Sequence, residues 1–176
     1  MVLDATVHLD PATPADAERL SNLLELYIHD MSAFYPHVEI GNDGRFGYPQ
    51  LPLYWSEPGR YPFSIRCGER VAGFVLAKRG SPASDDPAVL DVVEFFVLRQ
   101  FRREGVGRAA ALRLWQQLPG SWTVRVSEGN RGALEFWSGV IAEAANGTAI
   151  ESSRPGRSHP WRVFAFCVAG PGDAAG

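Results

Sequence analysis

Cysteine and long apolar runs are both scarce in this chain of 176 residues. The two cysteines, Cys67 and Cys167, lie in apolar segments, which favours two buried thiols in a reducing compartment over a disulfide. No apolar run approaches the length that crosses a bilayer. The first residues, Met-Val-Leu-Asp-Ala-Thr, show no basic region followed by an apolar core, so no signal peptide is expected. These absences predict a cytoplasmic protein that contacts no membrane.

Signals for metal and nucleic-acid binding are missing as well. No His, Cys or carboxylate spacing suggests a metal site, so no metal is expected. A sequence pI near 5.8 argues against nucleic acid as the main partner. There is no internal repeat and no linker, which predicts one domain over residues 1–169 and a frayed tail at 170–176.

Charge is unevenly distributed along the chain. Residues 1–60 hold nine acidic and three basic side chains, whereas residues 61–176 hold eleven acidic and fourteen basic ones. This asymmetry favours a basic lobe for an anionic cofactor and an acidic lobe facing a cationic substrate. A solvated acidic surface without a role explains the same asymmetry equally well.

Hydrophobic periodicity predicts the element order β–α–α–β–β–β–α–β–α–β–β. Strands are expected near 6–9, 62–67, 71–77, 88–98, 121–126, 147–152 and 160–168, and helices near 13–31, 51–55, 104–118 and 130–141. A three-residue connection, 68–70, is expected to close a hairpin. This order is that of an α/β sandwich with a mixed, mostly antiparallel sheet.

The most informative stretch, residues 94–112, combines a buried strand, a basic turn and the start of an alanine-rich helix. The first amides of a helix lack internal partners, and the helix dipole places partial positive charge on them. Gly105 and Gly107 would let a ligand approach these amides closely. Arg102, Arg103 and Arg108 add positive charge around them. The stretch therefore predicts a phosphate site.

Three glycine motifs compete to explain this phosphate site. A P-loop is excluded because Gly107 is followed by Arg108 and not by the Lys-Ser or Lys-Thr pair. A dinucleotide fingerprint fits Gly105, Gly107 and Ala110, with Glu128 about twenty residues further on. In that fingerprint, however, the glycines directly follow the strand, and here a basic turn intervenes. No run of βαβ units completes a doubly wound sheet either.

The third explanation includes the turn itself. Residues 102–107, Arg-Arg-Glu-Gly-Val-Gly, fit Arg/Gln-x-x-Gly-x-Gly, and residues 130–137, Asn-Arg-Gly-Ala-Leu-Glu-Phe-Trp, look like Asn-x-x-Ala-x-x-Phe-Tyr. Together the two motifs resemble the GNAT superfamily of acyl-CoA N-acyltransferases over about residues 60–143. The resemblance implies a GNAT-like three-layer α/β sandwich whose splayed central sheet admits the pantetheine arm of acetyl-CoA.

The resemblance also implies which residues contact this co-substrate. They are Phe96, Val97, Leu98, Arg102, Arg103, Glu104, Gly105, Val106, Gly107, Arg108, Asn130, Ala133, Phe136 and Trp137. A backbone N–H near Val97 would be left free by the splayed strand and could stabilise the oxyanion.

Acyl transfer to an amine requires that the amine lose its proton. A lysine-like amine has a pKa near 10.4, so only about one in a thousand is neutral at physiological pH, and a positioned base contributes roughly 10²- to 10⁴-fold. Glu94 is the best candidate base, because it should point into the cleft if Val93, Phe95 and Val97 face the helix layer. Apolar neighbours should raise its pKa. Asp91 is the second candidate, and a structural glutamate paired with an arginine is the competing explanation.

The sequence departs from the family motif at Trp137, where many members have a tyrosine that protonates the departing thiolate. An indole N–H donates hydrogen bonds but does not give up its proton. The proton would then come from water or from another phenol, with Tyr27, Tyr35 and Tyr54 as candidates.

The resulting hypothesis is an N-acetyltransferase that moves an acetyl group from acetyl-CoA to the primary amine of a small molecule by direct attack. The acceptor pocket is expected within residues 27–60, with Tyr27, Tyr35, Tyr54 and Trp55 as substrate contacts. The protein would be a monomer or a homodimer. The alternatives are a non-catalytic CoA-binding or regulatory module and a protein or peptide N-acetyltransferase.

Overall fold

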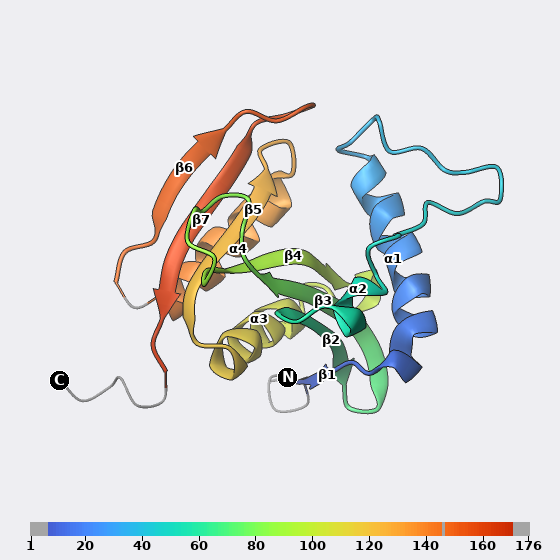
Figure 1. Cartoon of the computed structure of the whole chain (residues 1–176), viewed down its shortest axis with the longest axis horizontal. Helices are drawn as coiled ribbons and strands as arrows, with labels where there is room; N and C mark the ends of the chain where they lie inside the picture. Colours follow the sequence, from blue (N-terminus) through green and yellow to red (C-terminus); the bar gives the residue numbers. More distant parts are fainter. Residues whose placement is uncertain (1–6, 146, 171–176) are drawn as a thin grey trace.

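The computed structural model describes residues 7–145 and 147–170 and shows an α/β fold built on one open, mixed seven-stranded sheet (Figure 1). The elements follow the predicted order. The strands are β1 (Val7–Pro11), β2 (Arg60–Cys67), β3 (Arg70–Arg79), β4 (Leu90–Val97), β5 (Gly120–Ser127), β6 (Ile150–Arg154) and β7 (Trp161–Val168). The helices are α1 (Ala17–Ser32), α2 (Leu53–Ser56), α3 (Val106–Gln117) and α4 (Arg131–Ala144), with 3₁₀ turns at Pro14–Asp16 and Arg99–Phe101. The expected tail at 170–176 lies outside the described residues except for residue 170, as does the first residue of the strand expected at 6–9.

The sheet has the strand order β1-β2-β3-β4-β5-β7-β6 and is antiparallel everywhere except between β4 and β5. That parallel pairing is short, because only Leu90–Val92 pair with Trp122–Val124. Beyond this point β4 continues to pair with β3, and β5 continues to pair with β7. The two halves of the sheet therefore separate, as the predicted splayed sheet requires.

Helices cover both faces of the sheet and produce three layers (Figure 1). On one face, α1 buries Leu20, Leu23 and Leu24 against Phe74 and Phe96. On the other face, α3 and α4 pack on the larger hydrophobic core, which includes the buried indoles of Trp115 and Trp122. Within the described ranges, no helix combines the length and the apolar character needed to span a bilayer.

A β-bulge in β4 decides which side chains face which layer. Leu76 of β3 lies opposite Glu94, but the next residue, Ala77, lies opposite Val92, which leaves Val93 as the extra residue. Val93 therefore packs with the α1 cluster, and its expected place on the face of Phe95 was wrong. Strict alternation from Val92 would have placed Glu94 on the α3 face.

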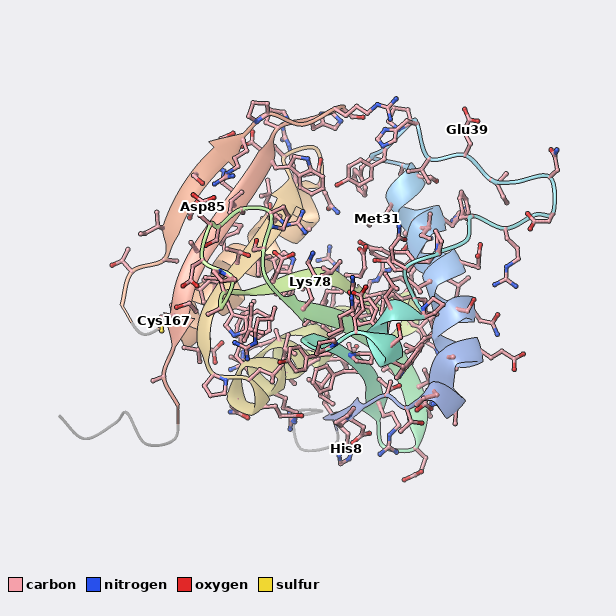
Figure 2. The ribbon with its side chains drawn as sticks, viewed as in Figure 1. His8, Met31, Glu39, Lys78, Asp85 and Cys167 are labelled. Atoms are coloured by element: carbon pink, nitrogen blue, oxygen red, sulfur yellow. The ribbon has the colours of Figure 1, made fainter. Side chains whose placement is uncertain are left out.

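Two further expectations were wrong in detail. The connection between β2 and β3 has two residues, because Cys67 pairs with Arg70, and Gly68 takes the positive φ of 58° that suits the first position of a type II′ turn. The thiols were expected to be buried, but Cys67 is half-buried and Cys167 is exposed on β7 (Figure 2). Neither forms a disulfide.

Gly73 allows the close approach of β3 to β4. A Cβ atom at this position would lie 1.9 Å from the Phe96 carbonyl oxygen, so Gly73→Ala must displace the backbone of β4. We expect Gly73→Ala to lower the free energy of unfolding by about 2 kcal/mol or more, as overpacking does in a well-packed core. Denaturant titration measures this change.

Gly139→Ala is the matched control. Gly139 lies on the exposed side of α4, where a Cβ would meet nothing within 4 Å. This substitution should stabilise the protein by about 0.5–1 kcal/mol, because alanine has less backbone entropy to lose in a helix. Equal stability of the Gly73→Ala protein and the wild type would contradict the close packing of β3 on β4.

Candidate active site

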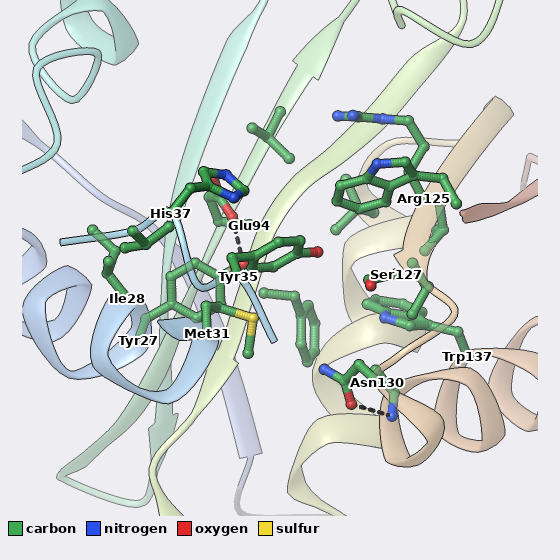
Figure 3. Close-up of a pocket in the computed structure, with 18 residues that line it drawn as sticks. Tyr27, Ile28, Met31, Tyr35, His37, Glu94, Arg125, Ser127, Asn130 and Trp137 are labelled. Atoms are coloured by element: carbon green, nitrogen blue, oxygen red, sulfur yellow. Dashed lines mark hydrogen bonds between the residues drawn. The ribbon is translucent and has the colours of Figure 1, made fainter. Parts of the chain in front are cut away.

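A cavity of about 400 Å³ opens where β4 and β5 separate (Figure 3). Its walls come from α1 and the segment that follows it, from β4 and β5, from the start of α4, and from β7. They are formed by Tyr27, Ile28, Met31, Tyr35, His37, Val38, Val92, Val93, Glu94, Phe95, Val124, Arg125, Val126, Ser127, Asn130, Ala133, Trp137 and Trp161. The cavity thus joins the acidic amino-terminal part of the chain to the second motif, and no residue of the first motif lines it.

Glu94 projects into this cavity from the face of β4 that α1 covers, and both of its carboxylate oxygens accept hydrogen bonds. The Tyr27 hydroxyl donates to Oε2 at 2.5 Å, and the Tyr48 hydroxyl donates to Oε1 at 3.0 Å (Figure 3 shows the Tyr27 bond). Burial raises the pKa of Glu94, while the two phenols and the positive charge of Arg125 oppose that rise. The result is a carboxylate that is more basic than one in water.

The two phenols remain donors to Glu94. Burial, together with the negative charge of Glu94, raises the pKa of Tyr27 and of Tyr48 well above that of an exposed tyrosine. Sequence reasoning missed Tyr48, because it lies in an irregular, glycine-rich segment without periodicity. Tyr48 reaches Glu94 across 46 residues of sequence.

Asp91, the second candidate base, has a different environment. Its side chain is fully buried and does not line the cavity. It accepts hydrogen bonds from the hydroxyls of Ser81, at 3.1 Å, and Thr123, at 2.8 Å. It also forms an ion pair with Arg125, whose Nη2 and Nε lie 2.8 and 3.2 Å from the two carboxylate oxygens.

Arg125, which sequence reasoning also missed, does line the cavity. Burial disfavours its charged form, but the hydrogen bonds and the negative charge of Asp91 outweigh that effect and raise its pKa. The alternation of polar Thr123, Arg125 and Ser127 with Val124 and Val126 could have indicated a polar face of β5. The sequence contained no sign that this face meets Glu94.

The turn between β4 and α3 contains two residues with left-handed backbone. Arg103 has a φ of +63°, and Gly105, the residue before α3, has a φ of +78°. Gly105 has no side chain with which to cap the first amides of the helix. Glu104 is exposed in the turn, whereas Val106 is buried in the core.

Two of the three arginines predicted to meet a phosphate form ion pairs within the protein. Arg102 donates from Nε to the Val97 carbonyl oxygen at 2.7 Å and from Nη2 to Asp30 at 2.6 Å. Arg108 forms a bidentate ion pair with Glu143 of α4. Arg103 is exposed.

The three predicted backbone contacts on β4 differ in orientation. The Leu98 N–H donates to the Ala72 carbonyl oxygen at 2.8 Å, and Phe96 lies directly opposite Phe74 of β3. Because backbone groups alternate along a strand, those of Val97 point the other way, toward the gap beside β5. Val97 is therefore the member of the three whose N–H can meet a ligand in the gap.

The predicted residues of the second motif gather around α4. The Asn130 side chain caps α4 by accepting a hydrogen bond from the Ala133 N–H at 3.1 Å, and both residues line the cavity with Trp137 (Figure 3). Phe136 lies outside the cavity and packs over Gly107, where a Cβ would lie 3.3 Å from its ring. The two motifs thus meet at the start of α3.

The structure separates the four residues expected to contact the acceptor. Tyr27 and Tyr35 line the cavity, and Tyr35 stacks on Trp161 with ring centroids 5.8 Å apart. Tyr54 is buried in the α1 cluster, because the short helix α2 packs there. Trp55 donates from Nε1 to the Ala12 carbonyl oxygen and does not line the cavity.

Comparison with known sequences identifies one family. The profile of the acetyltransferase (GNAT) family matches residues 21–139, which is most of the chain. No curated protein matches the sequence significantly.

Solved structures of acetyltransferases share the fold at low sequence identity. An acetyltransferase from Thermus thermophilus is 22% identical, with 92% of this chain and 97% of that chain covered and a TM-score of 0.62. Arabidopsis thaliana NAA60 in complex with acetyl-CoA is 14% identical, with coverage of 93% and 100% and a TM-score of 0.59. A mutant of the spermidine N-acetyltransferase SpeG from Vibrio cholerae is 10% identical, with coverage of 93% and 94% and a TM-score of 0.60.

The raised pKa of Glu94 predicts a pH-dependent stability. The ordinary pKa of a glutamate is 4.5, and above this pH the Glu94 carboxyl keeps its proton more readily in the folded protein than in the unfolded chain. Stability from this group is therefore fully present below pH 4.5 and is lost as the pH rises through the folded-state pKa. The free energy of unfolding of the wild type, minus that of Glu94→Gln, should fall across this range. Denaturant titrations at several pH values measure it.

Glu135→Gln, at an exposed position of α4, controls for the loss of one negative charge. A stability difference between wild type and Glu94→Gln that rises with pH would contradict a raised pKa of Glu94.

Proposed function

The chain belongs to the acetyltransferase (GNAT) family, and from that membership we propose that it transfers the acetyl group of acetyl-CoA to the primary amine of a small molecule. The observation that carries this proposal is the place of Glu94. Its carboxylate faces a cavity that begins where β4 and β5 separate. The amine would attack the thioester directly, without an acyl-enzyme intermediate.

The diphosphate of acetyl-CoA would lie against the first amides of α3. Gly105 places no side chain next to these amides, and a Cβ there would meet nothing within 4 Å, whereas the missing side chain of Gly107 makes room for Phe136. The helix dipole favours an anion at this helix start. The left-handed backbone at Arg103 supports this placement, because strained non-glycine residues cluster at ligand sites. The Arg103 side chain is exposed next to the amides and adds positive charge.

The pantetheine arm would enter the gap between β4 and β5. Val97 would offer its backbone N–H to this arm, since its carbonyl oxygen accepts from Arg102, and Asn130, Ala133 and Trp137 line the cavity. The thioester carbonyl would then lie near the Val97 N–H, which would stabilise the developing oxyanion.

Glu94 would accept the proton of the attacking amine. A more basic carboxylate accepts this proton more readily. The hydrogen bonds from Tyr27 and Tyr48 hold the Glu94 carboxylate in one orientation. Since the Trp137 indole does not release a proton, the departing thiolate would take one from water or from Tyr35, the phenol of the cavity wall that forms no hydrogen bond with Glu94.

The decisive experiment is a measurement of thiol release from acetyl-CoA against a panel of amines, amino acids, polyamines and short peptides. With the best acceptor, Glu94→Gln should lower kcat/KM by about 10²- to 10⁴-fold. In the wild type, kcat/KM should rise with pH through the raised pKa of Glu94, because only the ionised carboxylate accepts a proton.

The affinity for acetyl-CoA, measured by calorimetry, should stay within about twofold in Glu94→Gln, because the side chain faces the acceptor side of the cavity. Unchanged turnover in Glu94→Gln would remove Glu94 as the base. Binding of acetyl-CoA without turnover against any amine of the panel would favour a non-catalytic CoA-binding module.

The proposed diphosphate site predicts a specific effect of charge at Arg103. Arg103→Glu should weaken acetyl-CoA binding by about tenfold, which corresponds to the loss of one charge-assisted hydrogen bond. Arg157→Glu, the same change at an exposed position between β6 and β7, is the matched control and should alter the affinity less than about twofold. Calorimetric titration measures both, and equal effects would place the diphosphate elsewhere.

A further inference from the structure

We propose that the acceptor is an amino carboxylic acid, whose carboxylate binds Arg125 while its amine faces Glu94. This inference rests on the proposed acetyl transfer and names the class of acceptor. It follows from the way in which Arg125 is fixed at the cavity, from the charges on the two walls, and from a buried hydroxyl beside Arg125.

The Arg125 guanidinium is held by one edge and open on the other. Its Nε and Nη2 atoms contact the Asp91 carboxylate at 3.2 and 2.8 Å, whereas Nη1 has no hydrogen-bond partner among the residues that the structure describes. The side chain is 26% exposed and lines the cavity. A guanidinium presents five N–H donors in a planar fork that matches a carboxylate, so the open edge can bind a second one.

Three buried side chains hold Arg125 in place directly or through one another, although one carboxylate would be enough to neutralise its charge. Asp91 is fully buried and receives the hydroxyls of Ser81 and Thr123 in addition to the guanidinium. A buried ion pair of this kind is weak as a device for stability, because desolvation offsets its Coulomb energy. It does hold the guanidinium in one orientation, so we assign Asp91, Ser81 and Thr123 as positioning residues for Arg125.

The two walls of the cavity carry opposite charges. Glu94 comes from β4 and Arg125 from β5, and both side chains line the cavity (Figure 3). An amino acid has a cationic amine and an anionic carboxylate, so its charges complement both walls. A polyamine would place a second ammonium against Arg125, which disfavours it.

Ser127 provides a second donor on the same wall. It lies two residues after Arg125 on β5, so both side chains project from the same face of the strand. Its hydroxyl is buried, with 3% of the residue exposed, and it interacts with the Tyr35 phenol, because Ser127 opposes the rise that burial causes in the pKa of Tyr35. Both residues line the cavity (Figure 3), where the Ser127 hydroxyl can also meet a ligand oxygen.

The test compares acceptors that differ only in the carboxylate. For wild type, kcat/KM is measured with glycine, β-alanine, 4-aminobutyrate and L-phenylalanine, with the corresponding amides, and with spermidine. We expect at least one acid to exceed its amide by about tenfold or more. The amine of an amide is less basic and is neutral more often, so a preference for the acid must come from recognition of the carboxylate.

Two variants distinguish recognition of the acceptor carboxylate by Arg125 from a purely structural role of Arg125. The double variant Asp91→Asn/Arg125→Gln removes both charges of the pair and leaves no unpaired buried charge, and Arg125→Lys keeps the charge without the fork. In the double variant, kcat/KM for the preferred acid should fall about 100-fold, as when one partner of a hydrogen-bonded charge pair is lost. The value for the amide should fall much less, so the preference for the acid over its amide should disappear. Arg125→Lys should recover part of the loss.

The outcomes distinguish this inference from the proposal on which it rests. Equal losses for acid and amide in the double variant would assign Arg125 a structural role and overturn the inference. Turnover of amides or spermidine in preference to every acid would overturn it as well, while leaving the acetyltransferase activity in place. Absence of both acetyl-CoA binding and turnover would defeat the proposed function itself.

Discussion

Strand β4 has hydrogen-bonded neighbours on both sides only as far as Val92, and the cavity depends on this loss of one partner. From that point the strand is held by β3 alone, where Gly73 permits the two backbones to approach closely. Backbone groups that point into the gap have no neighbouring strand to pair with, and buried groups of this kind are costly without partners. A ligand that lies along the gap and pairs with them recovers that free energy, which is why an extended amide-containing arm suits this position.

The bulge at Val93 adds a second constraint at the same place. It reverses the alternation of β4, so Asp91 and Glu94 come to share the face that α1 covers. Two carboxylates on one partly buried face would repel each other and lose hydration. Two different sets of partners stabilise them: Asp91 forms an ion pair with Arg125, and Glu94 accepts hydrogen bonds from two phenols. Glu94 keeps a raised pKa, because of its burial, and lines the cavity.

Ion pairs connect the two halves of the site. Asp30, near the end of α1, accepts hydrogen bonds from Arg99 and Arg102, both at 2.6 Å. Burial alone would raise the pKa of Asp30, but these two arginines lower it. Ion pairs with exposed arginines each contribute only about 0–1 kcal/mol, so their main effect is geometric. They tie the turn before α3 to α1, which forms part of the cavity wall.

The sequence alone determined the features that are local in the chain: the order of the elements, the glycine turn before α3, the cap at Asn130, and Glu94 as the candidate base. Each depends on residues within one or two turns or strands, where periodicity and capping chemistry act. Only the tertiary structure decided that Val93 forms a bulge, that Tyr48 donates a hydrogen bond to Glu94, and that Arg125 lines the same cavity as Glu94. It also decided that Tyr54 and Trp55 lie outside this cavity. The physical reason is that these outcomes depend on strand register and on contacts between segments tens of residues apart, which no local pattern encodes.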